Sequence, residues 1–330
     1  MKRFFTLTIL LTTLLLTGCS STVERTEIFM GTVVTLKATG FDAQAAVDES
    51  FHAIAELERN ISADVAKIEA DDDFVDVSPD VYKILQTAQI FSELTGGAFD
   101  VTVGAAVDLW SVGTDRQRVP TSDELAAAKN LVGREHLQLR DGKVHLDSGV
   151  KLNLGGIGKG YGVDIVRKIF AAHNITNGLI DFGTSTIFAV GRKKIGIKNP
   201  REVDKLSAVV ELENSALSTS GDGEKFFVAN GWRYSHIIDP KTCAPIERQN
   251  TPQNFTRGDK VGMSSNQIAS TVPPLLKWQN FSVTVVVDGS CELCATVADI
   301  LSTAAAVDRE RVEEILSQQK IPAKIIDGDF

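Results

Sequence analysis

Asp299 and Thr303 are the pair of side chains whose type and spacing could do chemistry most directly. They lie four residues apart in an apolar stretch, 296–307, that predicts a helix, so their oxygens would lie on one face about one turn apart. Mg²⁺ prefers oxygen ligands of this kind and keeps water in its remaining positions. An Asp and a Thr that merely stabilise a helix have the same spacing, and from spacing alone we favour that plainer interpretation.

A run of spaced glycines offers a second candidate site, for an anion. The stretch Leu152 to Asp164 runs from an apolar strand through Gly155, Gly156 and further glycines into a helix predicted over 163–173. Glycines let backbone N–H groups approach phosphate, and a helix N-terminus adds positive potential. The run is not a P-loop, which needs Ser or Thr after Gly-Lys, and it is not a firm dinucleotide fingerprint.

His236 is the candidate for a base or orienting group, because the pKa of an unperturbed histidine lies near physiological pH. A lone histidine is more often structural or at the surface. We interpret the other four histidines in that way: His52, His136, His145 and His173.

Cys291 and Cys294 form a C-x-x-C pair, while Cys243 stands alone. Such a pair can close as a disulfide, act as a redox pair or hold half of a metal site. No second pair or His doublet has zinc-finger spacing, which disfavours a structural zinc. We favour a local disulfide or two reduced thiols over redox catalysis.

The elements that must position these residues follow from periodicity and turn signals. The pattern predicts helices over 43–59, 81–94, 121–131 and 296–307, a strand over 26–38 interrupted by Met30-Gly31-Thr32, a hairpin over 137–147, and strands over 178–181, 187–191, 194–198, 208–212 and 282–287. The polar stretch 247–280 has little periodicity and predicts a surface insertion.

The N-terminus is typical of a lipoprotein signal peptide. Lys2 and Arg3 precede an apolar run that is too short to span a bilayer and ends in Leu-Thr-Gly-Cys19. We expect residues 1–18 to be removed and Cys19 to carry lipid, leaving one domain over 19–330. A signal peptide in which Cys19 is incidental is the alternative.

Charge excludes one class of partner. The formal net charge is −9 over 330 residues, which argues against nucleic acid or anionic lipid as the partner.

Read together, the segments resemble the ApbE family of FAD:protein FMN transferases over nearly the whole chain after residue 18. The matching pieces occur in family order: Met30-Gly31-Thr32, Thr95 to Asp100, Gly155 to Asp164, Thr219 to Asp222, Tyr234 to Pro240, and Ala298 to Ala304. The resemblance implies an α+β fold with mixed sheets, related to the T-fold, in which the flavin lies between two interlocked lobes. It also implies Mg²⁺-dependent cleavage of FAD and covalent transfer of FMN to a Ser or Thr of an acceptor protein.

Roles for individual residues are also implied by the resemblance. Mg²⁺ would be bound by Asp299, Thr303 and the backbone carbonyl of Gly156, and His236 would act in catalysis and contact the cofactor. The remaining cofactor contacts would be Met30 on the isoalloxazine, Ala98, Phe99, Asp100 and Asn153 at the nucleotide, Lys159 beside the phosphates, and Thr219 and Asp222 at the pocket rim.

The implied acceptors are flavin subunits of Na⁺-translocating NADH:quinone reductase or Rnf-type complexes, reached from the periplasmic side of the inner membrane. An Mg²⁺-dependent FAD pyrophosphatase and a non-catalytic flavin-binding lipoprotein remain as alternatives to the transferase.

Four positions depart from the family pattern. Asn153 stands where Asp is common, Thr184 occupies the second position of an expected Gly-Gly, and Cys243 replaces a glycine. The early aromatic residue that contacts the flavin is not recognisable near Ser62. We expect these changes to affect the adenine or ribose contacts more than the metal site.

Overall fold

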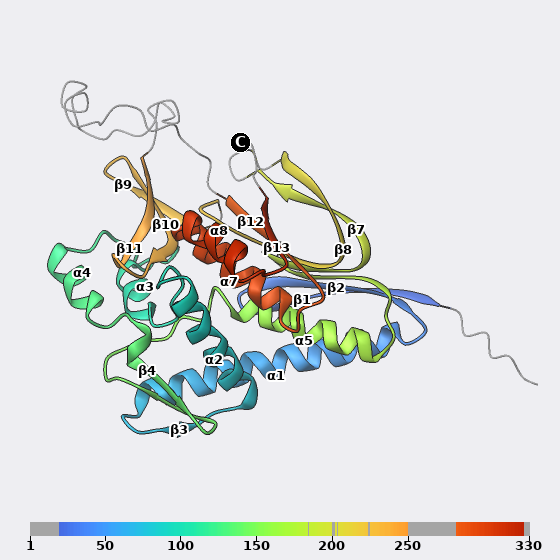
Figure 1. Cartoon of the computed structure of the whole chain (residues 1–330), viewed down its shortest axis with the longest axis horizontal. Coiled ribbons are helices and arrows are strands. Elements are labelled where there is room, and N and C mark those ends of the chain that lie inside the picture. Colours follow the sequence, from blue (N-terminus) through green and yellow to red (C-terminus); the bar gives the residue numbers. More distant parts are fainter. Residues whose placement is uncertain are drawn as a thin grey trace, which may run out of the picture.

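A seven-stranded antiparallel sheet forms the centre of the computed structural model, which describes residues 20–326 except 184, 200, 201, 203, 224 and 250–281 (Figure 1). Its strand order is β1-β2-β6-β7-β8-β12-β13. The strands are β1 (Ser21–Phe29), β2 (Thr32–Gly40), β6 (Asn177–Phe182), β7 (Thr186–Lys198), β8 (Leu206–Gly221), β12 (Ser282–Asp288) and β13 (Ala323–Ile326).

Three helices pack beside one another on this sheet: α1 (Ala43–Ala70), α5 (Gly158–Ala172) and α7 (Cys294–Val307) (Figure 1). The last helix, α8 (Arg309–Gln318), follows α7 directly. Apolar side chains of the sheet and of all four helices form the main core, because each helix presents an apolar stripe to it. The middle of this layer, where α5 meets α7, carries the candidate site.

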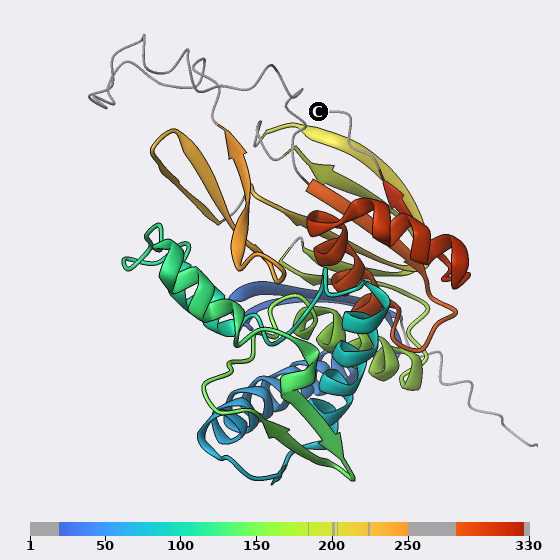
Figure 2. The same ribbon diagram turned by 60° about the vertical axis from the view of Figure 1, so that its left-hand side comes forward.

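Two smaller sheets flank the central layer. One has the order β11-β10-β9 and packs with α3 and α4 around Trp110, Phe227 and Tyr234, and the other has the order β3-β5-β4 and lies near α2 (Figure 2). Their elements are β9 (Phe226–Ala229), β10 (Trp232–Asp239), β11 (Ala244–Gln249), α3 (Gly104–Trp110), α4 (Ser122–Lys129), β3 (Val75–Asp76), β4 (Leu137–Arg140), β5 (Lys143–Leu146), α2 (Pro79–Leu94) and the 3₁₀ helix η1 (Arg134–His136).

Local signals predict several elements correctly. The hairpin β4–β5 turns at Asp141 and Gly142, which both have positive φ. Ser78 caps α2, and Thr121 with Glu124 forms a capping box at α4. The α+β class is confirmed as well.

Several element boundaries differ from the prediction. Helix α1 continues to Ala70, eleven residues beyond its predicted end, and α5 begins at Gly158, five residues before its predicted start. The predicted strand 26–38 is the β1–β2 hairpin, and 187–198 is one strand, β7, with an irregularity at Gly191. Residues 247–249 of the predicted insertion belong to β11.

Some predictions fall outside the described residues: the signal peptide 1–18, the lipid-bearing Cys19, Thr184, and the insertion after residue 249. Within the described part of the chain, no helix combines the length and hydropathy that a membrane crossing requires.

Candidate active site

The glycine turn before α5 lies directly against α7. A Cβ added to Gly160 would lie 2.5 Å from the carbonyl oxygen of Ala295 and 2.8 Å from Cβ of Asp299. Only glycine allows this approach of two helices, so the turn and the helix that bears Asp299 are held in contact.

Asp299 is 2% exposed, and protein donors engage both of its carboxylate oxygens. The backbone N–H of Gly160 donates to Oδ2 at 3.0 Å, while the hydroxyls of Thr186 and Ser218 donate to Oδ1 at 3.1 and 3.2 Å. A carboxylate has about four acceptor positions. Because three are used, the carboxylate is held in one orientation and Oδ2 keeps a lone pair.

Thr303 and Gly156 complete a group of oxygen atoms with Asp299. A Cβ added to Gly156 would lie 3.0 Å from Oγ1 of Thr303. The Thr303 hydroxyl donates to the carbonyl of Asp299 at 3.1 Å, and Ser220 Oγ lies 3.2 Å away. Since the N–H of Gly160 donates to Asp299, it does not close the usual helical bond to the Gly156 carbonyl. The three residues predicted to bind Mg²⁺ therefore lie together, with Gly156 against Thr303 and Thr303 one helical turn from Asp299.

Asp164 fixes the start of α7. This residue of α5 is 1% exposed and accepts from the backbone N–H of Ala295 at 3.2 Å and of Thr296 at 2.8 Å, as well as from the Thr296 hydroxyl. Burial raises its pKa, while the hydrogen bonds from Thr296 and the nearby Arg167 guanidinium oppose that rise. Asp164 thus ties the first turn of α7 to α5.

A cavity of about 490 Å³ opens on the other side of the glycine turn. Helix α1 forms one wall and the loop before α5 forms the other, with the β1–β2 turn beside them. The lining residues are Met30, Glu58, Ile61, Ser62, Val65, Ala66, Glu69, Leu152, Asn153, Leu154, Gly155 and Gly158. Its volume and mixed lining are those of a small-molecule site.

Two glutamates of α1 hold the cavity walls together. Glu58 accepts from the backbone N–H of Met30 at 2.7 Å, and Glu69 accepts from that of Leu152 at 2.8 Å. Met30 has φ +52, a strained value for a side chain-bearing residue, so the hydrogen bond from Glu58 helps to hold the turn.

Three predicted cofactor residues lie at the cavity or at the glycine turn before α5. Met30 and Asn153 line the cavity, and the side-chain oxygen of Asn153 accepts from the N–H of Gly155 at 2.9 Å. Lys159 folds back so that its ammonium donates to the Gly155 carbonyl at 2.9 Å, which places a positive charge at the turn.

The segment Ala98 to Asp100 is buried beside the turn. A Cβ added to Gly156 would lie 3.2 Å from the Phe99 ring, so Phe99 borders the oxygen group. The Asp100 carboxylate accepts from Ser92 and from the N–H and hydroxyl of Thr102. In this structure Asp100 stabilises its own turn, and a nucleotide contact for it stays a prediction.

Thr219 lies on β8, and Asp222 directly follows the end of that strand. The Thr219 hydroxyl lies 2.9 Å from that of Thr284 on β12, and buried Asp222 forms an ion pair with Arg233 at 3.1 Å. Successive strand residues face opposite sides, so the neighbours Ser218 and Ser220, rather than Thr219, contact Asp299 and Thr303. Sequence reasoning missed these two serines and Thr186.

His236 is exposed on β10, where the pairing with β11 is irregular between Tyr234 and Ile238. Its Nδ1 lies 3.1 Å from the carbonyl oxygen of Lys225. A carbonyl only accepts, so Nδ1 carries the proton and Nε2 is the basic atom. The structure places His236 on the small sheet that meets α7 through β10.

Comparison with known proteins identifies the family. The model of the ApbE family matches residues 30–251, which is more than half of the chain. The chain belongs to the ApbE family. The resemblance carried by the six motifs is thereby confirmed, although the match ends before the last of them, on α7.

Relatives in the ApbE family extend this match. An FAD:protein FMN transferase of Treponema pallidum is 32% identical over 67% of this chain and 70% of its own length. One of Vibrio cholerae is 34% identical over 59% of this chain and 60% of its own length. The crystal structure of the ApbE protein of Thermotoga maritima superposes with a TM-score of 0.73 and 26% identity, covering 94% of this chain and 97% of that one. The structural match therefore covers nearly the whole chain.

Two departures from the ApbE pattern have structural explanations. Cys243 has φ +56, a backbone conformation that favours glycine, which accounts for the family's glycine there. Near Ser62, Ile61 and Val65 line the cavity in place of an aromatic residue, so that wall is aliphatic.

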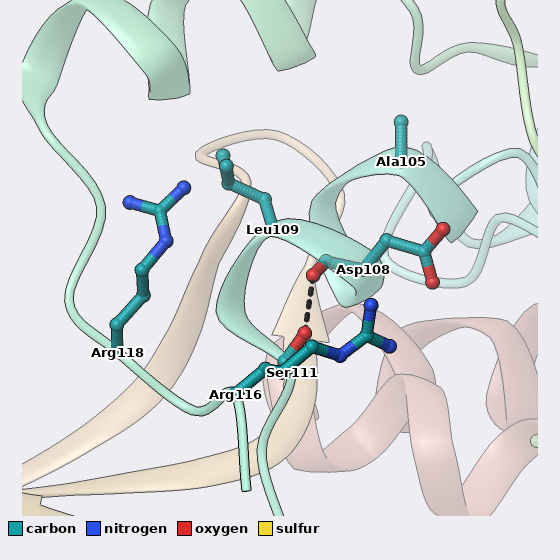
Figure 3. Close-up of a pocket in the computed structure, with 6 residues that line it drawn as sticks. All are labelled: Ala105, Asp108, Leu109, Ser111, Arg116 and Arg118. Atoms are coloured by element: carbon teal, nitrogen blue, oxygen red, sulfur yellow. Dashed lines mark hydrogen bonds between the residues drawn. The ribbon is translucent and has the colours of Figure 1, made fainter. Parts of the chain in front are cut away.

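A second cavity, of about 370 Å³, lies at the end of α3 and is lined by Ala105, Asp108, Leu109, Ser111, Arg116 and Arg118 (Figure 3). Asp108 forms an ion pair with Lys151, and Arg118 forms a two-point hydrogen bond with Glu124. Two of the three charged lining residues, Asp108 and Arg118, therefore have partners of opposite sign. None of these residues was predicted as functional.

Proposed function

We propose that this chain is an FAD:protein FMN transferase, which cleaves FAD with Mg²⁺, attaches FMN through a phosphoester to a Ser or Thr hydroxyl of an acceptor protein, and releases AMP. The observation that carries the proposal is that the glycine turn borders the cavity on one side and contacts helix α7 on the other. Gly155 and Gly158 line the 490 Å³ cavity, while Gly156 and Gly160 touch Thr303 and Asp299. One dinucleotide could therefore place its flavin in the cavity and its diphosphate beside the oxygen group.

The donor set suits magnesium. Asp299, Thr303 and the Gly156 carbonyl would supply three oxygen ligands, which is the chemistry that Mg²⁺ prefers when it also holds phosphates. Bound there, the ion would neutralise charge on the diphosphate. Within the described residues no group of three or more His, Cys, Asp or Glu side chains could hold a metal, so this single-carboxylate set has no rival of that class.

The chain's own residues would then position the reactants. The Lys159 ammonium at the glycine turn would bind phosphate oxygens, and Met30 would pack on the isoalloxazine. Nε2 of His236 would accept the proton of the attacking hydroxyl, while Nδ1 stays bonded to the Lys225 carbonyl.

The acceptor and the location belong to the same proposal. We expect acceptors among flavin subunits of Na⁺-translocating NADH:quinone reductase or Rnf-type complexes, and a lipid at Cys19 that holds the enzyme on the periplasmic side of the inner membrane. The signal-peptide pattern before Cys19 and the family relationship support this expectation.

Mass spectrometry tests the proposal. The full chain is incubated with FAD, Mg²⁺ and an Rnf-type flavin subunit, and the acceptor is expected to gain the mass of one FMN while AMP appears. Free FMN and AMP without acceptor modification would instead identify a pyrophosphatase. FAD that stays bound and intact would identify a binding protein, and either result would overturn the transferase assignment.

A further inference from the structure

We propose that Cys291 and Cys294 form a reversible dithiol–disulfide site, in which Cys291 exchanges with a disulfide-bearing oxidant and Cys294 closes the intramolecular bond. The site is separate from the flavin cavity and from the oxygen group at Asp299.

The two thiols differ in exposure in the way that such an exchange requires. Cys294 is the first residue of α7 and is completely buried, whereas Cys291, in the turn before the helix, is partly exposed. Both are free thiols. An oxidant can reach only the first sulfur, which assigns the attack to Cys291.

The thiols also differ in acidity. The hydrogen bond from Cys294 lowers the pKa of Cys291 despite its partial burial. The same hydrogen bond, together with burial, raises the pKa of Cys294. Because the thiolate is the nucleophile in exchange, Cys291 is the more reactive sulfur near neutral pH.

A proton acceptor lies beside the buried thiol. Cys294 Sγ is 3.6 Å from Oδ1 of Asp164, the carboxylate whose pKa burial raises. When Cys294 attacks, Asp164 is positioned to take its proton, because the buried thiol has no direct access to water.

The backbone around the pair is held in place by α5. Arg167 donates to the carbonyl of Cys291 at 3.3 Å and to that of Glu292 at 2.5 Å. The turn that carries Cys291 is thus fixed against the same helix that carries Asp164.

The exchange balances as two successive substitutions. The Cys291 thiolate attacks one sulfur of a disulfide R–S–S–R, forming a mixed disulfide and releasing RS⁻. The Cys294 sulfur, losing its proton to Asp164, attacks Cys291 Sγ and releases the second RS⁻. Both cysteines are oxidised and the external disulfide is reduced to two thiols.

Oxidation would act on the candidate active site through α7. Cys294 opens the helix in which Asp299 follows five residues later, and Asp164 anchors that same first turn. We therefore expect the oxidised chain to require a Mg²⁺ concentration several-fold different for half-maximal turnover. This consequence rests on the proposed transferase function, whereas the exchange itself does not.

The exchange is measured by mass. The full chain is equilibrated in mixtures of reduced and oxidised glutathione, quenched in acid, alkylated in denaturant and analysed by peptide mass spectrometry. A reversible 291–294 disulfide is expected, and Cys243→Ser should leave the transition unchanged because Cys243 is buried elsewhere. A pair that stays reduced in oxidised glutathione alone would overturn the proposal.

Single variants test the assigned roles. Cys294→Ala, an apolar replacement for a buried thiol, should trap glutathione on Cys291, whereas Cys291→Ser should trap none on Cys294. The opposite pattern would overturn the order of attack. Neither measurement uses FAD. Failure of the transferase proposal would therefore not affect these results, and failure of the thiol–disulfide proposal would not affect the proposal of FMN transfer.

Discussion

At position 299 a single carboxylate accepts three hydrogen bonds from the protein, and in the proposed function it would also bind a cation through its remaining lone pair. Asparagine preserves the shape and one acceptor, so the fold should survive Asp299→Asn. Loss of the anionic ligand should lower Mg²⁺-dependent AMP release on the order of 10²-fold or more.

Activity and thermal unfolding measured together separate these roles. Asp299→Ala leaves buried donors without an acceptor and should also cost about 1–3 kcal/mol of stability. Asp72→Asn, at an exposed position, serves as the control. Wild-type turnover and Mg²⁺ dependence in Asp299→Asn would remove the metal assignment.

His173 gives a pH-dependent contribution to stability. At the end of α5 its Nε2 lies 2.7 Å from Glu49 and its Nδ1 contacts Asp42, so hydrogen bonds first to Glu49 and then to Asp42 raise its pKa above the ordinary 6.5. A raised pKa in the folded state means that the contribution is complete below about pH 6.5 and is lost as pH rises through the folded value.

The measurement for His173 compares thermal midpoints. His173→Gln should be less stable than the parent chain at about pH 5.5–6, because this range lies below the ordinary pKa of histidine and His173 is then protonated. The difference should shrink above the raised pKa. A difference that is constant with pH would rule out protonation of His173 as its source.

The sequence indicated the segments that form the candidate site, but it did not show which side chains of β8 face that site. Asp299 and Thr303 lie one helical turn apart, as their spacing predicts, and Gly156, which the family resemblance implied, lies against Thr303. Their role as Mg²⁺ ligands stays a prediction. The motif Thr219 to Asp222, at the end of β8, indicated the right segment without showing that Ser218 and Ser220 face the site. A shift of one residue along a strand reverses the face, and only the pairing with β7 and β12 fixes it.

At the scale of elements, α1 is the wall that gives the cavity its size. Replacing Ala66, which lines the cavity, by Phe should fill part of the 490 Å³ and weaken FAD binding about tenfold or more. Titration calorimetry with FAD measures the change, and Arg59→Ala, at an exposed position of α1, is the matched control. Unchanged affinity in Ala66→Phe would place the flavin elsewhere.

The full length of α1 could have been predicted from the sequence. Ile61, Val65 and Ile68 continue the apolar spacing beyond the predicted end at residue 59. The early start of α5 could not, because glycines at 158, 160 and 162 disfavour a helix in isolation. Contact with α7 and the hydrogen bond from Gly160 to Asp299 stabilise that turn, and those contacts are distant in sequence.

At the scale of the whole molecule, the order of motifs along the chain predicted the family and the α+β class but not the layout. The central sheet begins with β1–β2, continues through β6, β7 and β8, and ends with β12 and β13, an order that depends on pairings between distant segments. The joining of the turn at 155–160 to α7 likewise depends on close packing across more than a hundred residues.

The proposed attachment to the membrane concerns the entire chain. Replacing Cys19 by Ser should release the protein from membranes into the soluble fraction, because acyl chains would supply its membrane affinity. Fractionation followed by immunoblotting measures the change, and Cys243→Ser, which leaves the N-terminus intact, should remain bound. A Cys19→Ser chain that still sediments with membranes would show another anchor.

Strand β1 would limit how far the cavity can lie from a membrane to which Cys19 is anchored. It begins two residues after Cys19 and leads to the turn at which Met30 lines the cavity. Nine extended residues measure about 30 Å. A lipid on Cys19 would thus connect the cavity to the bilayer through a paired strand and not through a flexible linker. Acceptor hydroxyls held at a height well above the length of this strand would not reach the flavin.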